Sequence, residues 1–79
     1  MNNEQQYRNA FIECFNLADS EAIDHLVYNT IPEWDSIGHM QLVATLEAVF
    51  DIMIDTDDII DLSSYEKGKE ILSKYGIQF

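Results

Sequence analysis

The sequence has few of the residues that cross-link or interrupt a small fold. Its 79 residues include one cysteine, one proline and three glycines. Cys14 alone excludes an internal disulfide, and the cysteine and two histidines lack the spacing of a zinc site. Apolar runs are no longer than three residues, as in Ala48-Val49-Phe50, so we expect neither a signal peptide nor a membrane-spanning segment. These absences predict a cytoplasmic, monomeric protein of one small domain, residues 1–79.

Basic residues are the second shortage. Four Lys and Arg against fifteen Asp and Glu give a formal net charge of −11, which opposes binding to nucleic acid or to anionic lipid. No Lys or Arg lies between Arg8 and Lys67, whereas thirteen acidic residues do. Because unpaired like charges repel within a small domain, so long a run favours a role beyond solubility. A field of one sign steers basic partner surfaces, so we expect transient docking to such partners.

A calcium loop is the alternative explanation for the acidic residues near position 55. An EF-hand loop needs oxygen ligands at alternate positions, a central glycine and a closing glutamate. Counted from Asp51, position three is Met53 and position six is Thr56; counted from Asp55, position five is Ile59. The pattern fails in both registers, so we predict no specific metal site.

Apolar residues recur at helical spacing through most of the chain, and no segment alternates as a strand would. The spacing predicts an all-α bundle with a long connection after the first helix and a short third helix. We place the helices at about 4–18, 36–51, 56–61 and 64–75. Asp35 or Ser36 is the expected N-cap of the second helix, and Ser63 with Glu66 forms a capping-box pattern before the fourth.

The helical spacing also predicts which side chains face the core. The inward residues are expected to be Tyr7, Phe11, Cys14, Phe15 and Ala18; then Leu42, Leu46, Val49 and Phe50; then Ile59, Ile60 and Leu62; and finally Ile71, Leu72 and Tyr75. Trp34 precedes the second helix and is expected to anchor the end of the long connection against the bundle.

Ser36 lies where a loop becomes a helix, which places its hydroxyl toward solvent. Most serines at such positions are helix caps. A nucleophilic serine would need an oriented base and an oxyanion hole. His39 is three residues away but has no evident orienting partner, and His25 lies in the long connection, so we do not expect an enzyme.

The residues around Ser36 carry a resemblance to a known family. Asp35-Ser36-Ile37, followed by Leu42, Leu46, Glu47 and Phe50, resembles the acyl carrier protein family, in which an Asp-Ser-Leu motif opens the second helix. The length, the acidity, the long first connection, the helix order and the later Asp58-Ile59 pair are similar as well. The resemblance covers nearly the whole chain and implies a four-helix bundle of the acyl-carrier type.

In that family the motif serine carries a 4′-phosphopantetheine arm derived from coenzyme A. The resemblance implies that a phosphopantetheinyl transferase modifies Ser36, flanked by the motif residues Asp35 and Ile37, and that the arm's thiol carries acyl or aminoacyl groups as thioesters. It implies docking to loading ligases and acyltransferases through basic surfaces. The docking residues would be Met40, Gln41, Ala44, Glu47, Asp57 and Asp58.

Two residues depart from the fatty-acid carriers of this family. Gly38 and Gln41 stand where those carriers usually have acids, which favours a specialised pathway such as polysaccharide decoration, amino-acid loading, or polyketide or peptide synthesis. We interpret His39 as an exposed, solvated side chain. An interior lined by Leu42, Leu46 and Ile54 is the expected shelter for a short chain. The alternative function is an acidic interaction module that never carries an arm.

Overall fold

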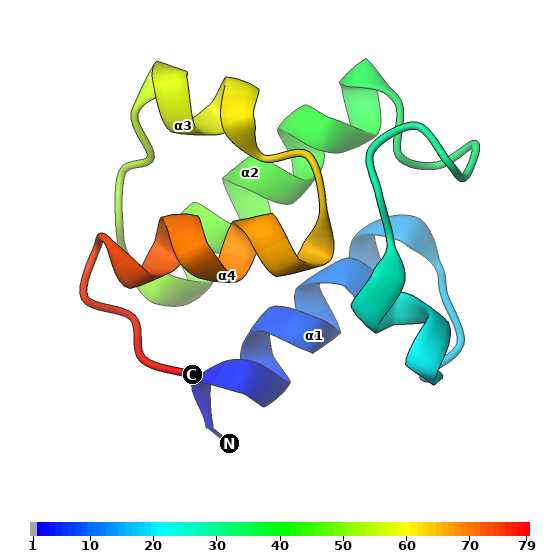
Figure 1. Ribbon diagram of the computed structural model, residues 1–79, viewed down its shortest axis with the longest axis horizontal. Coiled ribbons are helices and arrows are strands. Elements are labelled where there is room, and N and C mark those ends of the chain that lie inside the picture. The colour runs from blue at the N-terminus through cyan, green and yellow to red at the C-terminus, as the bar shows by residue number, and fades with distance from the viewer. Residues whose placement is uncertain (1) are drawn as a thin grey trace.

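All of the regular secondary structure in the described part of the chain is helical. The computed structural model describes residues 2–79, in which the elements are α1 (Asn3–Phe15), the 3-10 helix η1 (Glu21–His25), α2 (Ser36–Phe50), α3 (Thr56–Asp61) and α4 (Tyr65–Ser73). No β-strand occurs within these residues, although one isolated bridge pairs Val27 with Ser64. The prediction of a small all-α protein is confirmed. Figure 1 shows α4 lying between α1 and α3, with the start of α1 close to the C-terminal segment.

Local capping explains where α1 and α2 end. Asn16 adopts the left-handed conformation (φ 54°), and its N–H bonds to the carbonyl of Ile12, which ends α1 at Phe15. The predicted end at residue 18 was wrong because asparagine tolerates this conformation and stops the helix early. Asp51 ends α2 in the same way (φ 54°), one residue before the predicted end.

The fourth helix is shorter at both ends than the predicted 64–75. Its N-cap is Ser64, whose Oγ accepts a hydrogen bond from the N–H of Lys67 at 3.0 Å. The expected pairing of Ser63 with Glu66 was therefore one residue out of register. The helix ends at Ser73, and Gly76 (φ 87°) lies in the turn that follows it.

An aromatic cluster forms the centre of the core. Trp34, at 0% exposure, packs on Phe15 with ring centroids 5.4 Å apart and meets the edge of Phe11 at 5.4 Å. Phe11 in turn contacts Tyr65 of α4 at 5.0 Å. Burial of such large rings is the main source of stability in a domain of this size. The prediction that Trp34 anchors the long connection is confirmed.

The long connection, residues 16–35, is held to α1 by polar bonds as well. The guanidinium of Arg8 bonds to Asp19 at 2.7 Å and to Asp24 at 2.6 Å, and it also donates to the carbonyl of Ser20. Ile23 of η1 is buried beneath these contacts. The connection is thus irregular in conformation but fixed at several points.

Several predicted core positions point elsewhere. Val49 is 41% exposed because the buried stripe of α2, at 100° per residue, is centred on Leu46 and leaves Val49 at its edge. Ile60 is 73% exposed, since the six-residue α3 buries only part of its surface. Ala18 is also exposed, because it lies beyond the end of α1. Cys14 is half-buried, with its sulfur 3.2 Å from the Thr45 hydroxyl.

Candidate functional site

Ser36 is the first residue of α2 and is exposed. The capping bond belongs to its neighbour: Asp35 Oδ1 accepts the N–H of Gly38 at 2.9 Å. Asp35 and Ser36 were both predicted as possible N-caps, and Asp35 is the N-cap of α2. Among residues 2–79, no hydrogen bond is recorded for the Ser36 hydroxyl. Its side chain is therefore not needed to start the helix and remains open to chemistry.

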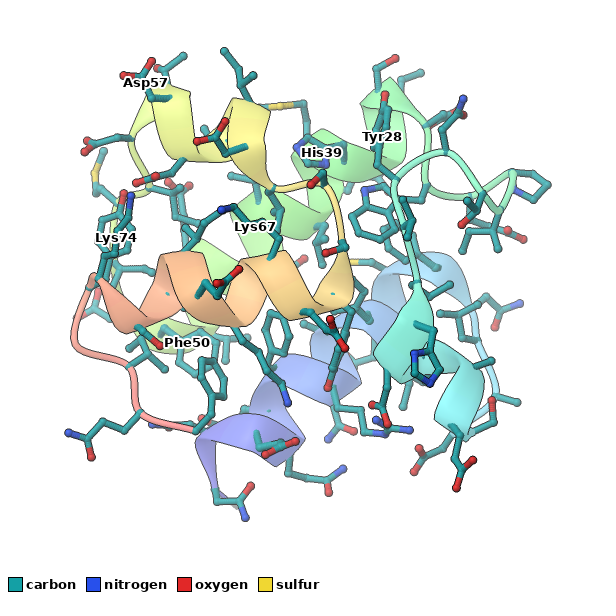
Figure 2. The ribbon with its side chains drawn as sticks, in the orientation of Figure 1. Tyr28, His39, Phe50, Asp57, Lys67 and Lys74 are labelled. Atoms are coloured by element: carbon teal, nitrogen blue, oxygen red, sulfur yellow. The ribbon has the colours of Figure 1, made fainter. Side chains whose placement is uncertain are left out.

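A groove of about 350 Å³ begins beside Ser36, between the N-terminal end of α2 and the C-terminal end of α3. Its lining is mostly apolar and consists of Tyr28, Ser36, His39, Met40, Ile59, Ile60, Leu62 and Ser63. Figure 2 shows Tyr28 of the long connection next to His39 of α2 at this end of the molecule. The volume is at the small end of the range of ligand sites.

Besides His39, five of the lining residues were not predicted as part of the site. Tyr28 comes from the long connection, Ile59 and Ile60 from α3, and Leu62 and Ser63 from the segment before α4. A bridge brings the two segments together, with the N–H of Tyr28 donating to the carbonyl of Ser63 at 2.8 Å. No sequence spacing could have revealed this pairing, because it joins residues 35 positions apart in irregular segments.

The interior expected as a shelter for a short chain is closed, and its opening stays a prediction. Leu42, Leu46 and Ile54 are buried in the general core and do not line the groove. The groove is a feature of the surface.

The backbone of Glu33 lies so close to Gly38 that it leaves no space for a side chain at this position. A Cβ atom at this position would lie 2.0 Å from the carbonyl oxygen of Glu33, in the turn that leads into α2. Any larger side chain would force this turn away from the helix. The absence of an acid at this position therefore has a steric cause, because the end of the long connection packs directly on the first turn of α2.

His39 is half-buried and bonded on both ring nitrogens, not solvated as predicted. Its Nδ1 accepts the indole N–H of Trp34 at 3.0 Å, and its Nε2 lies 2.8 Å from the carbonyl oxygen of Ile59 in α3. The ring lies nearly parallel to the Trp34 ring, and the edge of Tyr28 lies 5.3 Å away. His39 is thus a link between the long connection, α2 and α3.

The predicted docking residues of α2 are mostly on the surface. Ile37 and Met40 are 72% and 53% exposed, and Gln41 and Ala44 are exposed as well. Glu47 is half-buried because its Oε2 accepts the N–H of Ile54 at 2.9 Å, which fixes the segment between α2 and α3. Their role in docking stays a prediction.

The two predicted docking acids of α3 occupy different environments. Asp57 is exposed, whereas Asp58 is buried at 6% exposure. The Asp58 carboxylate accepts bonds from Lys74 at 2.5 Å and from the Tyr75 hydroxyl at 2.6 Å. These donors favour the charged form and lower the pKa of Asp58, the Lys74 bond contributing most. Asp58 therefore ties α3 to the end of α4 and is not available as a surface acid.

The few basic residues lie away from the groove. Arg8 is on α1, Lys67 and Lys69 are on α4, Lys74 follows it, and each forms an ion pair with an acidic residue. Neither α2 nor α3 contains a lysine or arginine, and the acidic residue Asp35 directly precedes Ser36 at the start of α2. In the part of the chain that is described, no group of three potential metal ligands converges, and no helix is long and apolar enough to cross a membrane.

Comparisons with protein-family models, with curated proteins and with solved structures gave no match to this chain. The functional argument therefore depends on the site itself.

Proposed function

We propose that the protein is an acyl carrier protein whose Ser36 bears a 4′-phosphopantetheine arm. The observation that carries the proposal is that Asp35 and Ser36, neighbours at the start of α2, have different roles. Asp35 caps the helix, while the adjacent Ser36 hydroxyl is exposed and unused beside an apolar groove. A serine that only capped a helix would make the bond that Asp35 makes.

The residues around Ser36 suit such an arm. The hydroxyl is accessible to a modifying enzyme, and a rigid helix presents it. The apolar side chains of Tyr28, Met40, Ile59 and Ile60 line a groove next to the attachment point and would hold the arm or a small group at its end. When bound, the arm supplies a thiol that carries cargo as a thioester.

Attachment is a simple phosphoryl substitution at Ser36. Its Oγ forms a bond to the phosphorus next to pantetheine in coenzyme A, the anhydride bond of coenzyme A breaks, and adenosine 3′,5′-bisphosphate leaves. The hydroxyl proton passes to a base on the transferase, because no base within the described residues contacts the Ser36 hydroxyl. The protein is thus the substrate of its transferase and not an enzyme.

The surface favours partners with basic docking sites. With no lysine or arginine on α2 or α3, the field around Ser36 is negative and would steer a transferase, a loading ligase or an acyltransferase toward it. Ile37 and Met40 provide exposed apolar contacts at the centre of this face. We propose acyl or aminoacyl groups of a specialised pathway as the cargo, since the groove is small and the buried core is separate from it.

The test is the intact mass of the purified protein after incubation with coenzyme A and a promiscuous phosphopantetheinyl transferase. We expect one phosphopantetheine increment in the wild type and in Ser63→Ala, and none in Ser36→Ala. Ser63 is a matched control because it is exposed and lines the same groove. No increment where a control carrier is fully modified would contradict the proposal and favour the acidic interaction module.

A further inference from the structure

The bonds of His39 define a single protonation state. The indole N–H of Trp34 can only donate, so His39 Nδ1 must accept. The carbonyl oxygen of Ile59 can only accept, so His39 Nε2 must donate. Two independent partners thus require the same neutral tautomer, with its proton on Nε2. A histidine that contributed only packing would not need two hydrogen bonds that require the same tautomer.

The carbonyl of Ile59, to which His39 bonds, lies near the C-terminal end of α3, where backbone carbonyls lack partners within the helix. The last carbonyls of a helix have no N–H in the helix to bond. The N–H of Leu62 donates to the carbonyl of Asp58 at 3.0 Å. The ring of His39 donates to the next carbonyl along the helix, that of Ile59. A residue of α2 therefore caps the C-terminal end of α3.

The other polar bonds of α3 lead to a different neighbour. Lys74 and Tyr75 hold Asp58, and the Tyr75 hydroxyl also accepts the N–H of Asp55 at 2.9 Å. These contacts fix α3 to the end of α4. Because a six-residue helix has little stability of its own, its position depends on such contacts. The His39 bond is the one from the helix that carries Ser36.

This bond also joins two residues that line the groove. Ser36 and Met40 line the groove from α2, and Ile59 and Ile60 line it from α3. His39 joins the two helices between these pairs, and its ring is hydrogen-bonded to the buried ring of Trp34. The position of α3 relative to Ser36 therefore depends in part on this side chain.

We propose that His39 is a positioning residue for the site at Ser36. In its neutral form, with Nε2 donating to Ile59, it holds α3 against the first turns of α2 and keeps the groove shallow and of fixed width. The role of the groove in holding a group attached to Ser36 rests on the proposed function. The attachment of α3 by His39 does not.

The experiment uses three variants that separate the two bonds. His39→Gln keeps an N–H near the Nε2 position and can still donate to Ile59. His39→Asn keeps an acceptor for Trp34 but is too short to reach Ile59, and His39→Ala removes both. The readout is amide hydrogen exchange at Ile59 and Leu62, compared with exchange at Phe11 in α1, together with the ¹⁵N shifts of the His39 ring in the wild type.

We expect the wild-type ring to carry a proton on Nε2 and none on Nδ1. Exchange at Ile59 and Leu62, relative to Phe11, should be about tenfold faster in His39→Ala and His39→Asn, the effect of losing one hydrogen bond, and near the wild-type rate in His39→Gln. A wild-type ring protonated on Nδ1 would overturn the proposal. So would equal exchange in all three variants, or acceleration at Phe11 by the same factor.

The same variants separate this inference from the proposed function. Exchange is measured on the unmodified protein, and each variant is then incubated with coenzyme A and the transferase. Absence of the mass increment with the expected exchange pattern would refute the carrier function and leave His39 as the residue that holds α3. A normal increment with unchanged exchange would refute the role of His39 alone.

Discussion

The long connection and α3 both border the groove at Ser36, but they are attached to the molecule in different ways. The connection has little regular structure, yet it buries Trp34 completely among the aromatic rings of α1. The helix α3 is regular, yet Ile60 points to solvent and polar bonds from His39, Lys74 and Tyr75 hold the element. Regular secondary structure is thus a poor guide to how firmly a segment is fixed.

The difference suggests a division of roles at the site. The connection packs on the first turn of α2 and fixes the Ser36 end of the groove, as the close approach of Glu33 to Gly38 shows. The opposite wall, α3, is held by hydrogen bonds from His39, Lys74 and Tyr75. Substitutions that each remove one attachment should therefore have effects of different size.

Replacing Trp34 with alanine should have the largest effect. Truncation of a buried aromatic costs about 3–5 kcal/mol, and the core of so small a domain supplies about that much in total. We expect Trp34→Ala to be largely unfolded by circular dichroism at 25 °C. Ile60→Ala, in exposed α3, should change the free energy of unfolding by less than about 0.5 kcal/mol. A folded Trp34→Ala would show that the connection is not the stronger attachment.

Gly38→Ala should disturb the contact between the connection and α2. The new Cβ would overlap the carbonyl oxygen of Glu33, so the turn must move. Overpacking of this kind costs about 1–3 kcal/mol, more than the helix propensity that alanine gains. Urea denaturation gives the free energy of unfolding, with Gln41→Ala on the exposed face as the control. A stabilised Gly38→Ala would contradict the packing described.

Asp58→Asn should weaken the attachment of α3 in a pH-dependent manner. Because Lys74 and Tyr75 lower the pKa of Asp58 below its usual value of 3.8, the charged carboxylate stabilises the folded state above that value. This contribution is lost as the pH falls through the lowered pKa. The thermal midpoint of Asp58→Asn should therefore lie below that of the wild type at pH 7, and the gap should close toward pH 2.

Asp57→Asn provides the matched control for this pH series. Asp57 precedes Asp58 on the same helix but is exposed. Its substitution should leave the midpoint near that of the wild type throughout. Equal effects of the two substitutions would show that Asp58 acts only through the general charge of α3.

Arg8→Gln should have the smallest effect. Arg8 pairs with Asp19 and Asp24, whose side chains are 63% and 47% exposed, and such pairs contribute about 0.2–1 kcal/mol each. We expect a loss of about 1 kcal/mol at low salt, reduced at high salt because the pairs are screened. Urea denaturation at two ionic strengths tests this. A loss as large as that of Trp34→Ala would mean that charge, not burial, holds the connection.

The helices could be predicted from the sequence, and the predictions that failed did so for physical reasons. The predicted bounds of α3 and the burial of Trp34 agree with the structure, because the helix stop signals are local and a large apolar ring before a helix has few other places to go. The direction of Ile60 could not be predicted, since six residues do not define a helical face. The stop at Asn16 was missed because an asparagine can continue or end a helix.

At the site, Ser36 and Asp35 could be found from a local motif, whereas the groove could not. The bonds of His39 to Trp34 and Ile59, and the burial of Asp58 by Lys74, join separate elements. Their residue types are common on helix surfaces, so the sequence pattern predicted solvated side chains. Contacts of this kind become apparent only when the elements are placed in space.

The most direct test of the central claim is to locate the added mass within the chain. After modification by the transferase, fragmentation of the protein should place one phosphopantetheine increment on Ser36 and leave the nearby Ser63 and Ser64 unmodified. That result would establish the carrier function. An increment on another residue, or none beside a fully modified control carrier, would contradict it.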